Sequence, residues 1–292
     1  MAVGTVTLKT YTENSKPDTW CPGCGHFGVK RAMQKAMVDL GLAPHEVVAV
    51  TGIGCSGKFN YYFGSNGFNS MHGRSLPVAQ AIKIANRNLT VIAAGGDGDG
   101  YGIGIGHFTH ACRRNVDITY VVMDNHIYGL TTGQTSPTSE KGFVTSTTPY
   151  GAAEYPIRPL ELALAAGCGF VAQGFSGNQK QLARLFAEAI QHKGFSLINV
   201  YSPCVTYNGD QTYEFYRESL TDLDEKPDYQ PNDRQAAFKL VHETAGLVNG
   251  LIFKEERRDY QEELPNYYPG NLVEQDPSEP LRDRAELLAA FK

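Results

Sequence analysis

An aspartate and an asparagine stand where two apolar runs of the sequence end. Residues 89–94 lead into Gly-Gly-Asp-Gly, which contains Asp97, and residues 118–123 lead into Asp-Asn-His-Ile, which contains Asn125. A carboxylate, an amide oxygen and the free backbone carbonyls beyond Asn125, such as that of Ile127, suit a hard cation such as Mg²⁺. The glycines around Asp97 allow a phosphate to approach the backbone without meeting a Cβ atom. The pattern therefore predicts a site for Mg²⁺ and a diphosphate.

Parallel strands are needed to bring these two polar turns together. The 28 residues from Asp97 to Asn125 leave room for the helix that must connect parallel strands, which is expected at residues 102–115. Both apolar runs then become buried strands whose carboxyl ends lie at one edge of a sheet. Open α/β sheets bind their ligands at this edge.

Three alternatives compete for the same residues. A glycine-rich turn after a strand can be no more than a tight turn. A dinucleotide site is the second alternative, but no register of residues 95–106 satisfies G-x-G-x-x-G, which disfavours it. The third is that Asp99, which also lies in a Gly-Asp-Gly sequence, replaces Asp97. Asp97 is preferred because it is nearer the end of the strand, which would leave Asp99 beside the diphosphate.

Cysteines form a second group of residues that could carry chemistry. In Cys21-Pro-Gly-Cys24, the two-residue spacing lets both thiolates face one ion or cluster. Such a pair is a structural zinc site or a redox pair about as often as a cluster ligand. Cys112 and Cys168 are expected in the core as small hydrophobic side chains. Four cysteines are expected in loops, which is the number of thiolates that a [4Fe-4S] cluster requires: Cys21, Cys24, Cys55 and Cys204.

The rest of the pattern predicts an α/β fold, with a parallel sheet flanked by helices and an irregular C-terminal extension. The chain has 292 residues, 41% of them hydrophobic, which is enough for one large domain and an appendage. Residues 60–71 are expected to be irregular. Apolar periodicity predicts further strands at 46–53 and 196–201, and helices at 27–40, 77–86, 160–166 and 178–192.

The composition changes near residue 210. It divides the chain into residues 1–209, which carry the predicted binding sites, and residues 210–292, which are rich in proline, tyrosine and charge. Helical patterns recur in the second part at 233–247 and 279–291. The extension has too few apolar residues for a core of its own and is therefore expected to contact a partner through these side chains: Phe238, Leu240, Val241, Leu287 and Leu288.

Composition also excludes some classes of function. No run reaches the ~18 apolar residues of a membrane span, and residues 1–11 lack the apolar core of a signal peptide, so a cytoplasmic protein without a membrane partner is expected. Acidic side chains outnumber basic ones by 17 to 9 in residues 218–292, which argues against nucleic acid as a partner.

Taken in order, the motifs resemble those of the β subunit of the two-subunit 2-oxoacid:ferredoxin oxidoreductases over residues 20–215. They are Cys-Pro-Gly-Cys-Gly-His, Gly-Ile-Gly-Cys-Ser, His-Gly-Arg, Gly-Gly-Asp-Gly-Asp, Asp-Asn-x-Ile-Tyr-Gly-Leu-Thr and Gly-Gln-x-Ser-Pro-Thr. The resemblance implies the thiamine diphosphate-binding fold, in its diphosphate-type domain. It implies that Mg²⁺ is held by Asp97, Asn125 and the Ile127 carbonyl. It also implies that a [4Fe-4S] cluster is held by Cys21, Cys24, Cys55 and Cys204. The implied contacts of thiamine diphosphate are Ile53, Gly54, Cys55, Ser56, His72, Gly98, Asp99, Gly129 and Leu130.

The resemblance also implies an activity and its partners. Such enzymes decarboxylate a 2-oxoacid with thiamine diphosphate, pass two electrons through the cluster to ferredoxin and release an acyl-CoA. An α subunit with the pyrimidine-binding domain is implied, in an α₂β₂ assembly if the β chains dimerise. Thr132 is expected near the substrate tail. The favoured substrate is 2-oxoglutarate, with pyruvate or a broad range as alternatives. A non-catalytic iron–sulfur or zinc protein would need the cysteines but not Asp97 and Asn125.

Overall fold

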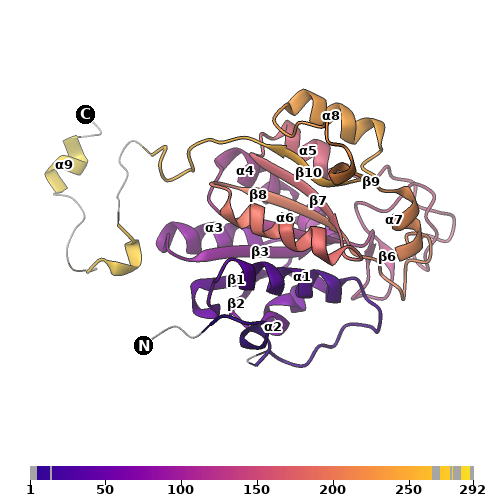
Figure 1. Ribbon diagram of the computed structural model, residues 1–292, viewed down its shortest axis with the longest axis horizontal. Helices are drawn as coiled ribbons and strands as arrows, with labels where there is room; N and C mark the ends of the chain where they lie inside the picture. Colours follow the sequence, from indigo (N-terminus) through magenta and orange to yellow (C-terminus); the bar gives the residue numbers. More distant parts are fainter. Residues whose placement is uncertain (1–4, 14, 265–269, 277, 279–283, 290–292) are drawn as a thin grey trace.

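A central sheet of eight strands organises the protein (Figure 1), for which a computed structural model describes residues 5–13, 15–264, 270–276, 278 and 284–289. Its strands are β1 (Val47–Thr51), β2 (Asn66–Asn69), β3 (Thr90–Gly96), β4 (Thr119–Asp124), β7 (Phe170–Phe175), β8 (Ser196–Tyr201), β9 (Thr221–Asp222) and β10 (Val248–Lys254). The strand order is β2-β1-β3-β4-β8-β7-β10-β9. Strands from β2 to β7 in this order are parallel, β10 is antiparallel to β7, and β9 is parallel to β10. The predicted α/β fold is confirmed.

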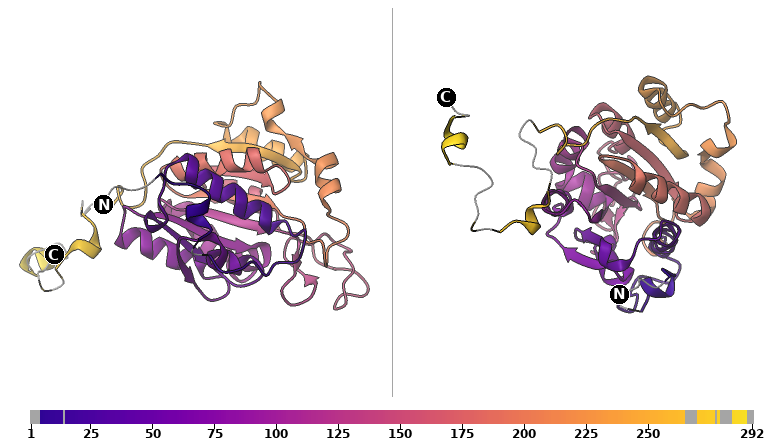
Figure 2. Two further views of the ribbon diagram at one scale, coloured as in Figure 1. Left: turned by 60° about the horizontal axis from the view of Figure 1, so that its bottom comes forward. Right: turned by 60° about the vertical axis from the view of Figure 1, so that its left-hand side comes forward.

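Helices cover both faces of the sheet, as the views in Figure 2 show. One face carries α1 (His26–Asp39), α2 (Phe59–Phe63) and α6 (Gln179–Gln191), and the other carries α3 (Ser75–Ala85), α4 (Ile105–Arg114), α5 (Pro159–Ala165) and α8 (Arg234–Glu243). Successive residues of β4 alternate between the two cores, since Tyr120 and Val122 join one and Val121 and Met123 the other. A strand that is buried on both faces reads as a continuous apolar run, which is why the sequence identifies β3, β4 and β8.

The carboxyl ends of the central strands lie level at one edge of the sheet. In the register of the ladders, Thr51 pairs with Ala94, Gly96 with Met123, and Asp124 with Tyr201. The turns that follow β1, β3, β4 and β8 therefore start side by side. These are the turns that carry the predicted chemistry, so the arrangement of the strands brings residues 52–56, 97–99, 125–130 and 202–204 to one place.

Smaller elements complete the structure. After β4, β5 (Ile127–Tyr128) and β6 (Gln134–Thr135) form a short antiparallel pair. Helix α7 (Tyr213–Ser219) packs Tyr216 against Phe175 and Tyr201, and helix α9 (Arg284–Ala289) lies near the end of the chain. Residues 60–71, expected to be irregular, contain most of α2 and all of the edge strand β2, so that expectation was wrong. None of the helices in the described part of the chain has the length and hydrophobicity that crossing a bilayer requires.

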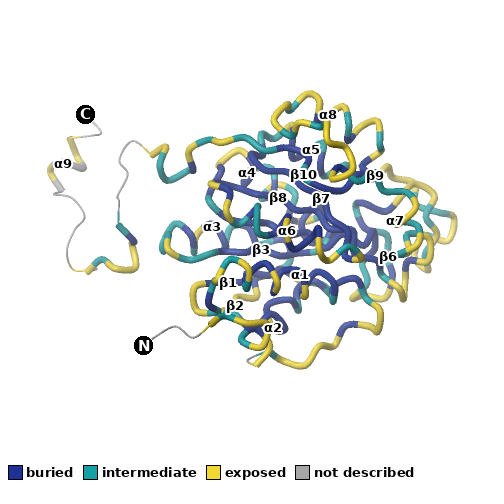
Figure 3. Tube along the Cα trace, in the orientation of Figure 1, coloured by how far each residue is buried: buried dark blue, intermediate teal, exposed yellow. Residues whose placement is uncertain are grey.

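The C-terminal extension is less irregular than expected, because its first half is built into the sheet. Strands β9 and β10 extend the sheet beyond β7, and Val241 of α8 is buried in the same core as β4. Figure 3 shows this burial in the sheet and in the helix sides that face it. Phe238 and Leu288 are exposed, Leu240 is partly buried, and the side chain of Leu287 lies outside the described residues, as does much of the predicted helix at 279–291. The division near residue 210 and the contact with a partner stay predictions.

Candidate active site

A cleft with about 570 Å³ of open space lies at the carboxyl edge of the sheet, and we call it the edge cleft. Its walls are the turns after β1, β3 and β4. All residues expected to hold Mg²⁺ or thiamine diphosphate line it: Ile53, Gly54, Cys55, Ser56, His72, Asp97, Gly98, Asp99, Asn125, Ile127, Gly129 and Leu130. The structure thus brings together side chains that are up to 77 positions apart in the sequence.

Asp97 follows β3 directly and is almost completely buried. Its Oδ2 atom accepts a hydrogen bond of 2.8 Å from the Thr138 hydroxyl. Burial and the negative charge of the neighbouring Asp124 raise the pKa of Asp97 to about 6, although Ser136, His126 and Thr138 act in the opposite direction. Two carboxyl groups buried side by side are costly without a cation. The surroundings of Asp97 therefore fit a bound cation.

Asn125 begins a tight turn at the end of β4. Its Oδ1 atom accepts a hydrogen bond of 3.2 Å from the Ile127 amide, and its carbonyl accepts one of 3.1 Å from Asn208 Nδ2. His126, between them, has a φ of 57°, the left-handed conformation that reverses the chain direction here. The turn places the Asn125 side chain and residue Ile127 on the wall that they share with Asp97.

Asp99 does not offer its carboxylate freely to the edge cleft. Its Oδ1 atom accepts hydrogen bonds from the amides of Ile53 and Gly73 and lies 2.7 Å from His72 Nδ1. A Cβ atom on Gly52 would lie 2.0 Å from Asp99 Oδ2, so the carboxylate is packed tightly against that glycine. Asp99 thus holds the turn after β1 and the His-Gly-Arg turn in place, a role that the sequence did not reveal. A contact between Asp99 and a diphosphate stays a prediction.

The four loop cysteines lie next to the edge cleft. A Cβ atom on Gly129 would lie 3.6 Å from Cys204 Sγ and 3.7 Å from Cys55 Sγ, so both sulfur atoms adjoin the same glycine of the wall. Burial raises the pKa of the Cys24 thiol to about 12, and the charges of Cys204, Cys55 and Cys21 raise it too, although the backbone at His26 lowers it. The raised pKa of the Cys24 thiol, with three other cysteines near it, fits a positively charged metal group that would stabilise the thiolate. Cys112 and Cys168 are buried in the core, as predicted.

The two ends of the cysteine group are tied together by His26 and its neighbours. His26 Nδ1 lies 2.9 Å from Ser202 Oγ and 3.4 Å from Cys24 Sγ, and the Gly25 amide donates to the Pro203 carbonyl. Burial lowers the pKa of His26 to about 4, so its ring is neutral near pH 7. In the described part of the chain, no three His, Cys, Asp or Glu side chains are grouped closely enough to hold a single metal ion.

Thr132, the residue expected near the substrate tail, does not line the edge cleft. It is exposed, with a φ of 76°, while the preceding Thr131 lines the wall. Its proposed closeness to a substrate tail stays a prediction. The sequence missed five residues of the wall: His26, Gly96, Met123, Tyr128 and Thr131. Tyr128 could have been predicted from the sequence, because it directly follows the predicted carbonyl ligand Ile127.

We expect Gly98→Ala to destabilise the protein. A Cβ atom at this position would lie 2.0 Å from Tyr128 Cε1 and would have to displace the ring. Overpacking of this kind costs about 1–3 kcal/mol, which lowers Tm by about 2–10 °C in a protein of this size. Thermal unfolding measures the effect. Gly106→Ala, in α4 and with no heavy atom within 4 Å of the added carbon, is the control and should match or exceed the wild-type Tm. An equal Tm for both variants would contradict the close packing of Gly98 and Tyr128.

Comparison with known proteins gives the same picture. The family model described as "Thiamine pyrophosphate enzyme, C-terminal TPP binding domain" matches residues 45–200, and the model for the C-terminal part of the pyruvate ferredoxin oxidoreductase beta subunit matches residues 204–268. The 2-oxoacid:ferredoxin oxidoreductase subunit beta of Saccharolobus solfataricus is 43% identical over 269 residues, 89% of this chain and 87% of the relative. The 2-oxoglutarate synthase subunit KorB of Methanocaldococcus jannaschii is 40% identical over 202 residues, 69% of this chain and 75% of the relative.

A solved structure extends the likeness over the whole chain. The 2-oxoglutarate:ferredoxin oxidoreductase from Magnetococcus marinus, with 2-oxoglutarate, coenzyme A and succinyl-CoA bound, superposes with a TM-score of 0.88 at 37% identity. The match covers 100% of this chain and 98% of that chain. A non-catalytic iron–sulfur or zinc protein is thereby set aside. The chain belongs to the β subunits of the 2-oxoacid:ferredoxin oxidoreductases and carries their thiamine diphosphate-binding domain.

Proposed function

We propose that this β subunit, together with an α subunit, catalyses the thiamine diphosphate-dependent oxidative decarboxylation of a 2-oxoacid, with 2-oxoglutarate as the favoured substrate. The products would be CO₂ and, with coenzyme A, an acyl-CoA, and the electrons would leave through a [4Fe-4S] cluster to ferredoxin. One observation carries the proposal. The edge cleft joins Asp97, Asn125 and Ile127 on one wall with Gly129, which adjoins the sulfur atoms of Cys55 and Cys204.

The protein's share in the proposed reaction begins with the diphosphate. Asp97, the Asn125 side chain and the Ile127 carbonyl would hold Mg²⁺, which takes few protein ligands and fills its other positions with phosphate oxygens and water. Gly98 packs against the Tyr128 ring, and Asp99 keeps the Ile53 turn and His72 in place around the cleft. When bound, thiamine diphosphate supplies the electron sink that lets the bond to the leaving carboxylate break.

The cysteines would hold the cluster directly beside that cofactor. Four cysteines are the number of thiolates that a [4Fe-4S] cluster requires. Trp20 supports one side of the site by donating a hydrogen bond of 2.7 Å to the Cys55 carbonyl. Because Cys55 lines the edge cleft and the Sγ atoms of Cys55 and Cys204 adjoin Gly129 of its wall, electrons released in the cleft would have a short path to the cluster. Cys21 is exposed, which gives an external acceptor such as ferredoxin access to that side.

The choice of 2-oxoglutarate rests on relatives. The Magnetococcus marinus enzyme was solved with 2-oxoglutarate and succinyl-CoA, and the Methanocaldococcus jannaschii relative is a 2-oxoglutarate synthase subunit. Pyruvate and a broad range of 2-oxoacids are the alternatives, since the Saccharolobus solfataricus relative is named only for 2-oxoacids. Thr132, beside the wall residue Thr131, remains the proposed position at which the substrate tail is read.

An α subunit would close the open side of the edge cleft. Large apolar side chains are exposed in the turns around it, including Ile53 and Leu130 of the wall itself and Met71 and Ile103 in neighbouring turns. Exposed apolar groups around a ligand site are typical of a surface that a partner covers. Such a partner would bring the pyrimidine-binding domain, and an α₂β₂ assembly would follow if the β subunits pair.

Activity with and without the α subunit tests the proposal. We expect the isolated chain to be inactive, because it cannot shield the cofactor from water or supply the acid–base assistance that contributes typically ~10²–10⁴-fold. With the α subunit, 2-oxoglutarate and coenzyme A should reduce ferredoxin or a viologen dye, and pyruvate should do so more slowly. Robust turnover by a monomeric β chain would contradict the proposal, and a faster reaction with pyruvate would reverse the substrate assignment.

A further inference from the structure

A buried set of hydrogen bonds begins at Asp97 and leads away from the edge cleft. The Thr138 hydroxyl lies 2.8 Å from Asp97 Oδ2 and 3.0 Å from Asp124 Oδ1. All three side chains are at least 98% buried. The Thr138 hydroxyl thus stands between the two carboxyl groups and keeps them apart. Its single hydrogen can be donated to only one carboxyl group at a time, and a donor at this position restricts the orientation of the Asp97 carboxylate.

The same hydrogen bonds continue through the centre of the sheet. Asn199 of β8 donates to Asp124 Oδ2 at 3.2 Å and to Gln173 Oε1 at 3.0 Å. Gln173 of β7 then donates to the carbonyls of Gly246 and Val248, each at 2.6 Å. These carbonyls lie at the start of β10. A continuous path of buried hydrogen bonds therefore connects Asp97 with the C-terminal strand through Thr138, Asp124, Asn199 and Gln173.

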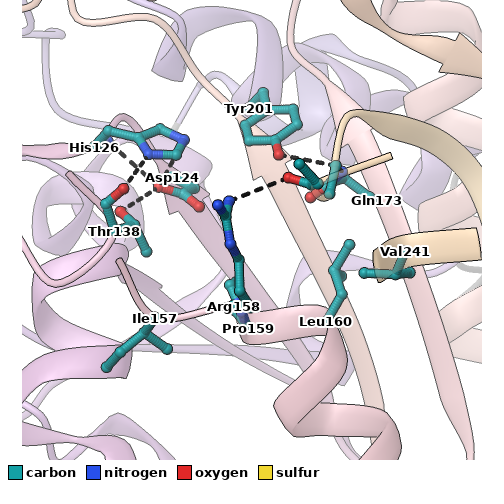
Figure 4. A pocket seen from close by; sticks show the side chains of 12 residues that line it. Asp124, His126, Thr138, Ile157, Arg158, Pro159, Leu160, Gln173, Tyr201 and Val241 are labelled. Carbon is teal, nitrogen blue, oxygen red and sulfur yellow. Dashed lines mark hydrogen bonds and ion pairs between the residues drawn. The ribbon is translucent and has the colours of Figure 1, made fainter. Parts of the chain in front are cut away.

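A second cavity adjoins Thr138 (Figure 4). Thr138, Asp124 and His126 form one side of it, and Arg158, which donates to the Ala245 carbonyl at 3.2 Å, reaches across it. Because Thr138 and Asp97 are both buried, the hydrogen bond between them is shielded from water.

We propose that Thr138 is the positioning residue for Asp97, and that the buried path through Asp124, Asn199 and Gln173 anchors it to β10. The proposal rests on the assignment of Asp97 as a ligand of Mg²⁺. It gives the C-terminal segment a role inside the subunit, namely to hold a metal ligand of the active site in its binding geometry. Partners of metal ligands act in this way when they fix the plane of a carboxylate, and their loss weakens metal binding by about 10–100-fold.

The test compares Thr138→Val with Thr138→Ser in the complex with the α subunit. Valine keeps the shape and loses the hydroxyl, whereas serine keeps the hydroxyl. Calorimetry measures the Mg²⁺ concentration that gives half-maximal binding of thiamine diphosphate. Thermal unfolding without Mg²⁺ is measured on the same variants. We expect this concentration to rise about 10–100-fold in Thr138→Val and to stay close to that of the wild type in Thr138→Ser. Gln173→Leu, at the other end of the path, should raise it in the same direction.

The outcomes separate the two levels of the proposal. If the wild-type complex binds thiamine diphosphate without needing Mg²⁺, the proposed metal site itself fails. If the wild type needs Mg²⁺ but Thr138→Val needs no more of it, the positioning role is refuted, even if the variant unfolds at a lower temperature. If Thr138→Val does not fold, Thr138→Ala takes its place, and equal Mg²⁺ requirements for the alanine and serine variants would overturn the inference.

Discussion

Asp97→Ala is expected to abolish retention of thiamine diphosphate while leaving the visible absorption of the iron–sulfur cluster intact. Asp97 is the only charged protein ligand assigned to Mg²⁺, so its loss leaves the diphosphate poorly neutralised. The cluster should survive, because the hydrogen bonds that support the cysteine loops come from Trp20, His26 and Gly25 and not from Asp97. Cofactor content after gel filtration and the absorption spectrum of the same sample measure the two effects.

Two further variants sharpen this experiment. Asp97→Asn keeps an oxygen ligand but removes the charge, so its cofactor content should lie between those of the wild type and Asp97→Ala. Asp222→Ala is the matched control, because Asp222 also makes side-chain hydrogen bonds, with Gln181 and Asp224, but does not line the edge cleft. Full cofactor retention in Asp97→Ala would refute the assignment of the metal ligand.

Cys204→Ser and Cys55→Ser should each lower the content of iron and acid-labile sulfide, whereas Cys112→Ser and Cys168→Ser should not. The first two sulfur atoms adjoin Gly129 at the edge cleft, while the other two are buried in the apolar core. The core variants should instead lower Tm, since a hydroxyl is costlier than a thiol to bury in apolar surroundings.

The iron and sulfide content and the Tm therefore respond differently in the two pairs of variants, which distinguishes cluster ligands from core cysteines. Iron and sulfide per chain, determined on the same preparations as the unfolding curves, give the comparison. Should Cys112→Ser lose iron while Cys204→Ser keeps it, the set of cluster ligands would have to be redrawn.

The sequence predicts the part of the fold that local signals control. Strands β3, β4 and β8 are short apolar runs that end in glycine or polar residues, and each was expected within two residues of its observed bounds. Because parallel strands align their carboxyl ends, the location of the cleft followed from those strands alone. The residues that line it were expected from motif resemblance, and the structure places them together.

Features that depend on distant partners could not be predicted. Strand β7 contains Gln173 and Gly174, and β10 contains Asn249 and Gly250, so neither reads as an apolar run. Gln173 is polar because it serves the buried hydrogen bonds between β8 and β10, which no local pattern reveals. The role of Asp99 could not be predicted for the same reason, since its partners Ile53 and Gly73 lie 46 and 26 residues away in the sequence.

Asn208 links the turn that carries Cys204 to the turn that carries Asn125. Its side chain donates to the Asn125 carbonyl, and its own amide donates to the Cys204 carbonyl four residues before it. On the proposed assignments, the first turn supplies a ligand of the cluster and the second a ligand of Mg²⁺. Loss of the cluster would therefore loosen the Asn125 turn and weaken the binding of the diphosphate.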